Sequence, residues 1–171
     1  MTLFVPFDGS KLSEAALVRA TEFGTVFDED VLAASVIPSG NASYARERGW
    51  ITADEEFEME TAASRLRERV TTLCPGANFR YEEAERYAPA GAIARLLRRM
   101  ARDEDAPMVF IGSENAGRLV TGLSSVGKTV AADDAYDVVI VRHRSPAKLA
   151  KLREESPHGG QVSGFYRSGE E

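Results

Sequence analysis

Short, almost wholly apolar runs alternate along the chain with segments in which apolar residues recur at helical spacing. We predict the apolar runs to be strands covered on both faces, because they lack the alternation of a half-exposed strand. These runs are residues 3–7, 31–37, 108–111 and 138–141, and a weaker third strand is predicted at residues 78–82. Five buried-type strands separated by helical patterns therefore set the organisation of the chain.

The first two helices have recognisable ends. Ser10, after the turn Asp8-Gly9-Ser10, is a predicted N-cap, and Gly24 is the predicted stop of that helix. Thr52 and Glu55 have the spacing of a capping box, which predicts that a second helix opens there and runs to the residue before Pro75. Residues 39–51, which include the single tryptophan, are predicted to be a loop.

A third helix opens at Pro89, and a short fourth one is predicted from about residue 125 to 133. The strand–helix alternation predicts an α/β domain over residues 1–144: an open, Rossmann-like parallel sheet of five strands with helices on both faces. Residues 145–171 lose periodicity and collect Ser, Gly, Pro, Lys and Glu, so we predict a disordered tail.

Ligands of open parallel α/β sheets bind at the carboxyl ends of the strands, where the strand order reverses. This rule selects the turn after the first strand and the loop after the fourth.

Composition narrows the class of partner. The 171 residues carry a formal net charge of −6, which argues against nucleic acid or an anionic membrane as a partner. The lone cysteine, Cys74, excludes an intramolecular disulfide and fits a reducing compartment, and we expect it to be inert. No signal peptide or membrane-spanning run is visible, so a cytoplasmic location is expected.

Residues 122–129, GLSSVGKT, match the phosphate-binding loop pattern G-x-x-x-x-G-K-[ST]. A P-loop requires a buried strand immediately before the first glycine, but residues 116–121 are polar and broken by glycine. A downstream acidic residue at a strand end, needed to hold magnesium, is also missing. The context therefore argues against a nucleotide-hydrolysing P-loop enzyme, in which Lys128 would be catalytic, and favours a surface lysine there.

The chain resembles the universal stress protein family. The opening V-P-F-D-G-S with S-x-x-A-L in the following helix is similar to the family's first strand and turn. The stretch MVFIGSENAGRLVTGLSSVGKTVAADDAYDVVIVRH resembles its second signature, in which a strand ends in Gly-Ser, a glycine-bearing loop follows, and Gly-Ser-Val opens a short helix. The resemblance covers residues 1–144. It implies a fold of the adenine nucleotide alpha hydrolase type and a homodimer paired through the last strand, from Val138 to Val141.

Family members that bind ATP carry a loop of the form G-x2-G-x9-G-[ST]. Gly112 matches its first glycine, Asn115 stands at the second, and Ser124 replaces the third, with the loop one residue shorter. Asn tolerates the left-handed backbone conformation better than other non-glycine residues, whereas Ser124 places a side chain where the backbone approaches phosphate. These two departures are the argument for a rival function, a dimer that binds no nucleotide and acts through protein–protein interaction.

The resemblance implies roles for further residues. Asp8 would contact the nucleoside beside Pro6, although it is equally able to cap the following turn. Val36 would line the adenine pocket unless it is simply core. Ser125 and Val126, at a helix N-terminus, favour phosphate, and Arg118 would close over it. The expected binding residues are Pro6, Asp8, Val36, Ile111, Gly112, Asn115, Arg118, Ser124, Ser125 and Val126.

The expected cofactor is ATP or another adenine nucleotide such as AMP, with any magnesium arriving on the nucleotide. His143 and His158, the only histidines, have no ligand cluster at metal spacing, so no metal site made by the protein alone is expected. No nucleophile, base and orienting group occur together, which favours ligand-dependent signalling in a stress response over catalysis. The charged run Arg65, Arg67, Glu68 and Arg69 is expected to be a solvated helix face.

Overall fold

The computed structural model of the protein describes residues 1–112, 129–130 and 133–142. Strands and helices alternate along most of this part of the chain, as the hydrophobic pattern predicts. Their bounds are β1 (Thr2–Pro6), α1 (Lys11–Phe27), β2 (Asp30–Pro38), α2 (Ala42–Glu47), α3 (Met59–Leu73), β3 (Asn78–Ala84), α4 (Ala90–Asp103), β4 (Met108–Gly112) and β5 (Asp137–Val141).

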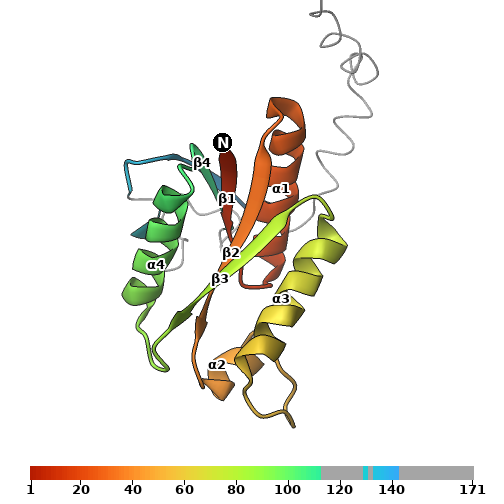
Figure 1. Ribbon diagram of the computed structural model, residues 1–171, viewed down its shortest axis with the longest axis vertical. Coiled ribbons are helices and arrows are strands. Elements are labelled where there is room, and N and C mark those ends of the chain that lie inside the picture. Colours follow the sequence, from red (N-terminus) through yellow and green to blue (C-terminus); the bar gives the residue numbers. More distant parts are fainter. Residues whose placement is uncertain (113–128, 131–132, 143–171) are drawn as a thin grey trace, which may run out of the picture.

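The strands form one parallel sheet in the order β3-β2-β1-β4-β5. Helices α1 and α3 lie on one face of it and α4 lies on the other (Figure 1). The predicted α/β class, with five parallel strands and helices on both faces, is thereby confirmed.

The sheet separates two apolar cores. Leu3 and Val5 of β1 pack with α1 and α3, whereas Phe4, between them, packs with α4. Because neighbouring side chains of a strand point to opposite faces, a strand covered on both sides must be apolar at every position. This is why β1, β2 and β4 are readable in the sequence as apolar runs, whereas the edge strand β3 is partly exposed and carries polar residues.

Three local predictions need correction, and the first is Gly24. The helix does not stop there but continues to Phe27, where Asp28 caps it in the left-handed conformation (φ 57°). Gly24 is buried inside α1, and a Cβ at this position would lie 2.7 Å from the carbonyl oxygen of Glu29. The glycine serves the close packing of the following turn rather than the end of the helix.

The second correction is the capping box. Glu55 does reach back to the Thr52 amide, at 2.7 Å, but the two residues close a turn, and α3 begins only at Met59. The carboxylate of Glu55 also accepts two hydrogen bonds from Arg65 of α3. It therefore makes a tertiary contact and does not cap the start of a helix.

The third correction lies in the predicted loop 39–51, which contains the six-residue helix α2. Asn41 caps it by accepting a hydrogen bond from the Tyr44 amide at 3.0 Å and donates to the carbonyl oxygen of Arg86, just beyond β3, at 2.7 Å. A helix this short has too few turns to show an apolar stripe, and a distant partner holds its cap.

Thr129 and Val130 are helical. They lie within residues 125–133, where a helix is predicted. The predicted tail, residues 145–171, lies outside the described residues.

Candidate functional site

The carboxyl ends of β1 and β4 are neighbours in the sheet, and the next helical residues described after each strand lie on opposite faces. After β1 the chain enters α1, on the face shared with α3, whereas Val130, downstream of β4, packs in the core on the α4 side. In open parallel α/β sheets, ligands bind outside the carboxyl ends of the strands, at the point where the strand order reverses. The sequence-based choice of these two strand ends therefore agrees with the strand order.

Asp8 lies in the turn directly after β1. Its Oδ1 accepts a hydrogen bond from the Ser10 amide at 2.9 Å. The carboxylate therefore caps the turn, which is one of the two roles expected for it. Ser10 in turn caps α1, since its hydroxyl oxygen accepts from the Ser13 amide at 3.2 Å. Asp8 is nevertheless exposed to solvent beyond the carboxyl end of β1, so capping leaves it accessible to a ligand.

The backbone of the same turn is held by donors from other parts of the chain. The Ser35 hydroxyl donates to the Phe7 carbonyl oxygen at 2.5 Å, and the Trp50 indole Nε1 donates to that of Asp8 at 2.7 Å. Arg69 Nη1 donates to the Gly9 carbonyl oxygen at 3.3 Å. Three successive carbonyls are therefore fixed by side chains that come from β2, from the connection between α2 and α3, and from α3.

Gly9 is required at this turn for two reasons. Its φ of +78° lies in the left-handed region, which disfavours side chains, and a Cβ there would collide with the Arg69 guanidinium. The glycine of the D-G-S motif thus allows an arginine from α3 to approach the backbone beside Asp8.

Pro6, Val36, Ile111 and Gly112 lie at or near the carboxyl ends of β1, β2 and β4. Val36 and Ile111 are buried in the core that faces α4, which agrees with a core role for Val36. Pro6 is partly exposed at the end of β1. The structure thus brings the predicted residues of the strands to one edge of the sheet.

The remaining predicted residues, Asn115, Arg118, Ser124, Ser125 and Val126, lie outside the described residues, as does Lys128. The described part of the site is therefore the wall built from β1, β2 and the end of β4.

The connection from α2 to α3, residues 48–58, is a part of this wall that the sequence did not reveal; we call it the Trp50 segment. Trp50 is 2% exposed and packs edge-to-face against Tyr44 of α2, with ring centroids 5.5 Å apart. A lone tryptophan in a polar loop was the available signal, because a large aromatic residue is rarely left in solvent.

The expectation of a solvated face on α3 holds only in part. Arg67 and Glu68 are exposed, but Arg65 and Arg69 are half-buried and donate to the Trp50 segment and to the turn after β1. Arginine suits this position because its planar guanidinium offers several donors in a fixed geometry.

Tyr44 and Arg48 form a stacked pair beside Trp50. The guanidinium carbon of Arg48 lies 3.4 Å from the centroid of the Tyr44 ring, a cation–π contact. Burial raises the pKa of the Tyr44 phenol, an effect that the Arg48 charge opposes and the Asp8 charge reinforces. The phenol is therefore neutral at physiological pH and places an uncharged, partly buried ring at this edge.

Within residues 1–112, 129–130 and 133–142, no group of three or more His, Cys, Asp or Glu side chains is placed to hold a metal ion. Cys74 is buried, and burial raises the pKa of its thiol. No helix in the described ranges has the length and apolar character needed to cross a membrane.

A model of the universal stress protein family matches residues 1–142 of the chain. The chain belongs to the universal stress protein family. A comparison with curated protein sequences gives no match.

Solved structures similar to this universal stress protein share its fold. A universal stress protein in complex with cAMP is 24% identical, with 85% of this chain and 98% of that chain covered and a TM-score of 0.52. UspA from Lactobacillus plantarum is 15% identical, with 83% and 97% covered and a TM-score of 0.55. A universal stress protein from Archaeoglobus fulgidus in complex with dAMP is 16% identical, with 82% and 95% covered and a TM-score of 0.50. The shared architecture is the adenine nucleotide alpha hydrolase-like α/β fold.

Proposed function

We propose that this universal stress protein binds an adenine nucleotide, ATP or AMP, at the carboxyl ends of β1 and β4, and that the bound nucleotide controls a role in stress response or signalling. The observation that carries the proposal is the reversal of strand order between β1 and β4, with α1 following β1 on one face and Val130, which precedes β5, on the other. Relatives of the same fold in complex with cAMP and dAMP support an adenine nucleotide as the ligand.

In this proposal the two halves of the ligand meet different parts of the chain. Asp8, exposed after β1, contacts the nucleoside, while Gly112 and the residues that follow it (Asn115, Arg118, Ser124, Ser125 and Val126) hold the phosphates, with magnesium carried in by ATP. Backbone amides at a helix N-terminus attract phosphate even in a chain with a net charge of −6.

The test is thermal unfolding with and without Mg-ATP, AMP, cAMP and Mg-GTP. A ligand at about 100 times its dissociation constant adds about 2.7 kcal/mol of stability. We expect the adenine nucleotides to raise the Tm and Mg-GTP to have a smaller effect. If none of the four shifts the Tm, the proposal is wrong.

Asp8→Asn is the matching variant, because the amide oxygen keeps the acceptor for the Ser10 amide while the negative charge is lost. We expect the unliganded variant to keep its Tm and to lose most of the nucleotide-induced shift. Asp103→Asn, an exposed substitution at the end of α4 on the opposite edge of the sheet, is the control and should behave as wild type. An unchanged shift in Asp8→Asn would remove Asp8 from the site.

The alternative function, a dimer that acts through protein contacts, is favoured by β5. Among the described strands β5 is an edge that pairs only with β4, and Val138, Val139 and Ile140 are partly exposed. An apolar edge strand is a template for pairing with a second chain. We propose that two copies pair through β5, whether or not nucleotide is bound.

Single cysteines introduced along β5 in a Cys74→Ser background test this pairing. In a symmetric dimer the two copies of a residue lie closest together next to the two-fold axis. The yield of disulfide-linked dimer should therefore be highest for one position of the cysteine and fall off on either side of it. Equilibrium sedimentation of the wild type gives the oligomeric state independently, and a monomer at all concentrations would rule the dimer out.

A further inference from the structure

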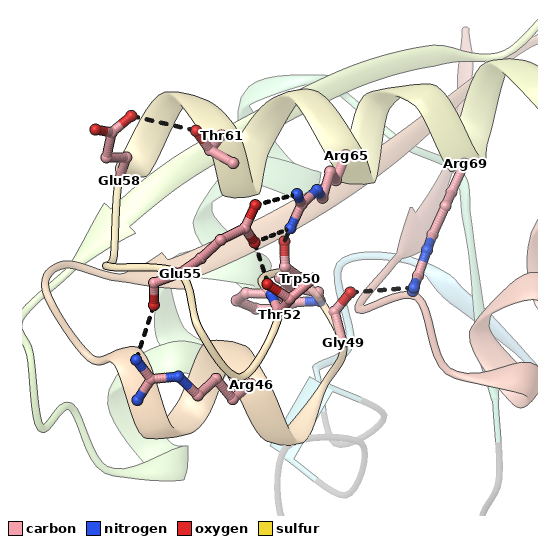
Figure 2. A network of polar contacts seen from close by, with 9 residues as sticks. All are labelled: Arg46, Gly49, Trp50, Thr52, Glu55, Glu58, Thr61, Arg65 and Arg69. Atoms are coloured by element: carbon pink, nitrogen blue, oxygen red, sulfur yellow. Dashed lines mark hydrogen bonds and ion pairs between the residues drawn. The ribbon is translucent and has the colours of Figure 1, made fainter.

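A polar network ties the Trp50 segment to α3 (Figure 2). The Arg65 guanidinium donates to both carboxylate oxygens of Glu55, each at 2.6 Å, and also to the Trp50 carbonyl oxygen at 3.0 Å. A bidentate salt bridge of this kind fixes the relative orientation of the two side chains as well as the distance between them. Arg65 therefore holds the segment at two points five residues apart.

Further bonds close the segment from its other sides. The Thr52 amide donates to Glu55 Oε2, and Arg46 of α2 donates to the Glu55 carbonyl oxygen at 2.8 Å. The hydrogen bonds from Arg65, followed by that from the Thr52 amide, lower the pKa of Glu55 to about 2. Glu55 is thus ionised over the physiological pH range and keeps its partners there.

The same segment reaches the turn after β1. Trp50 donates from its indole to the Asp8 carbonyl oxygen, and Arg69 donates from one nitrogen to Gly49 of the segment (3.2 Å) and from the other to Gly9 of the turn. The segment and the turn are therefore joined at Trp50 and at Arg69. The Asp8 carboxylate accepts a hydrogen bond from the Ser10 amide in its own turn, so its direction follows the backbone of that turn.

We propose that the Trp50 segment is a positioning element for Asp8: the Glu55–Arg65 pair fixes Trp50, Trp50 fixes the Asp8–Gly9 peptide, and Arg69 fixes the Gly9–Ser10 peptide. Gly9 is the joint that moves when these donors are lost, because glycine at positive φ has alternative backbone conformations open to it. The consequence for a ligand rests on the proposed nucleotide site, whereas the control of the turn does not. Since coupling is reciprocal, a nucleotide held by Asp8 also tightens the Trp50 segment.

Trp50→Phe tests the first step, since it keeps most of the buried ring and removes the indole donor. The readouts are NMR hydrogen exchange of the Ser10 and Ser13 amides without nucleotide, and the AMP dissociation constant by calorimetry. We expect Ser10 exchange to become about five-fold faster and AMP binding about five-fold weaker, the loss of one hydrogen bond. Ile93 in α4 reports general loosening and should exchange as in wild type.

Glu55→Gln and Arg65→Lys test the second step from outside the turn. Both should produce the same local change at Ser10, and the swap Glu55→Arg with Arg65→Glu should restore part of it. Glu104→Gln is the matched control, because Glu104 also forms a salt bridge with an arginine (Arg80 Nη1, at 2.6 Å) but lies at the end of α4. It should leave Ser10 and the AMP affinity unchanged.

The outcomes separate the two proposals. If wild type binds no nucleotide, the proposed function fails, and faster Ser10 exchange in the variants still supports positioning. Unchanged Ser10 exchange in Trp50→Phe and Glu55→Gln overturns the positioning role. Equal acceleration at Ser10 and Ile93 also overturns it, because that result means general stabilisation. If Trp50→Phe does not fold, Glu55→Gln decides alone.

Discussion

Gly112 ends β4 at the point where that strand meets the first turn of α1. A Cβ there would lie 2.7 Å from the backbone carbon of Leu12 and 2.8 Å from its Cβ, and backbone atoms do not move aside cheaply. We predict that Gly112→Ala lowers the free energy of unfolding by about 2 kcal/mol, measured by urea denaturation. Gly91→Ala is the control: it has open space in the first turn of α4, and should be neutral or stabilising by up to about 1 kcal/mol.

Asp133 is a buried acid between Val130 and β5. Arg98 and Arg102 of α4 donate to its Oδ2 at 2.7 and 2.6 Å, and the Ala135 amide donates to Oδ1. Burial by itself raises the pKa of Asp133, but these hydrogen bonds and charges outweigh it and hold the value at about 2. The residue anchors the chain downstream of β4 to the α4 face.

This anchor has a predictable pH dependence. The pKa is about 2 in the folded state against 3.8 in the unfolded state, so the stabilisation is complete above about pH 4 and is lost as the pH falls through 2. It amounts to about 2 kcal/mol at neutral pH. In urea titrations from pH 7 to 2, wild type should be more stable than Asp133→Asn at neutral pH, and the difference should shrink below pH 4. A constant difference at all pH values would contradict the ion pairs.

At the scale of the element, the start of α1 is fixed by local chemistry. Ser10 caps the helix through the Ser13 amide, while the Asp8 carboxylate holds the Ser10 amide. We predict that Ser10→Ala costs about 1 kcal/mol of unfolding free energy, the usual value of a lost N-cap. Thr25→Ala, on the exposed side of the same helix, should change stability by less than about 0.5 kcal/mol. Equal effects of the two changes would mean that the cap contributes nothing.

At the scale of the whole molecule, the sheet is stabilised by apolar side chains on both of its faces. Phe110, in the middle of β4, is fully buried and meets Phe23 of α1 edge-to-face with centroids 5.2 Å apart. We predict that Phe110→Ala lowers the unfolding free energy by about 3 to 5 kcal/mol, a large share of the 5 to 15 kcal/mol typical of a domain. Tyr87→Ala, which removes an 81% exposed ring, should be nearly neutral in the same chemical denaturation experiment.

The five strands, the α/β class and the strand ends at which a ligand is expected were all predictable from the order of the residues. Each predicted strand agrees with β1 to β5 to within two residues at either end. For β1, β2 and β4 the reason is that a strand covered on both faces carries its signal in its own residues. The N-cap at Ser10 was readable for the same reason, since its bonding partners are its immediate neighbours.

The strand order, the ends of several helices and the contacts that shape the described part of the site depend on the folded arrangement and could not be predicted from local patterns. Glu55 does not begin a helix because its carboxylate pairs with Arg65. Gly24 does not end a helix because its role is to let Glu29 pack closely against it. Asn41 caps α2 and also donates a hydrogen bond to Arg86. The link from Trp50 to Asp8 joins residues 42 positions apart. Local patterns predict what neighbours in the chain can satisfy, whereas a hydrogen bond between distant segments exists only once the sheet and its helices have brought them together.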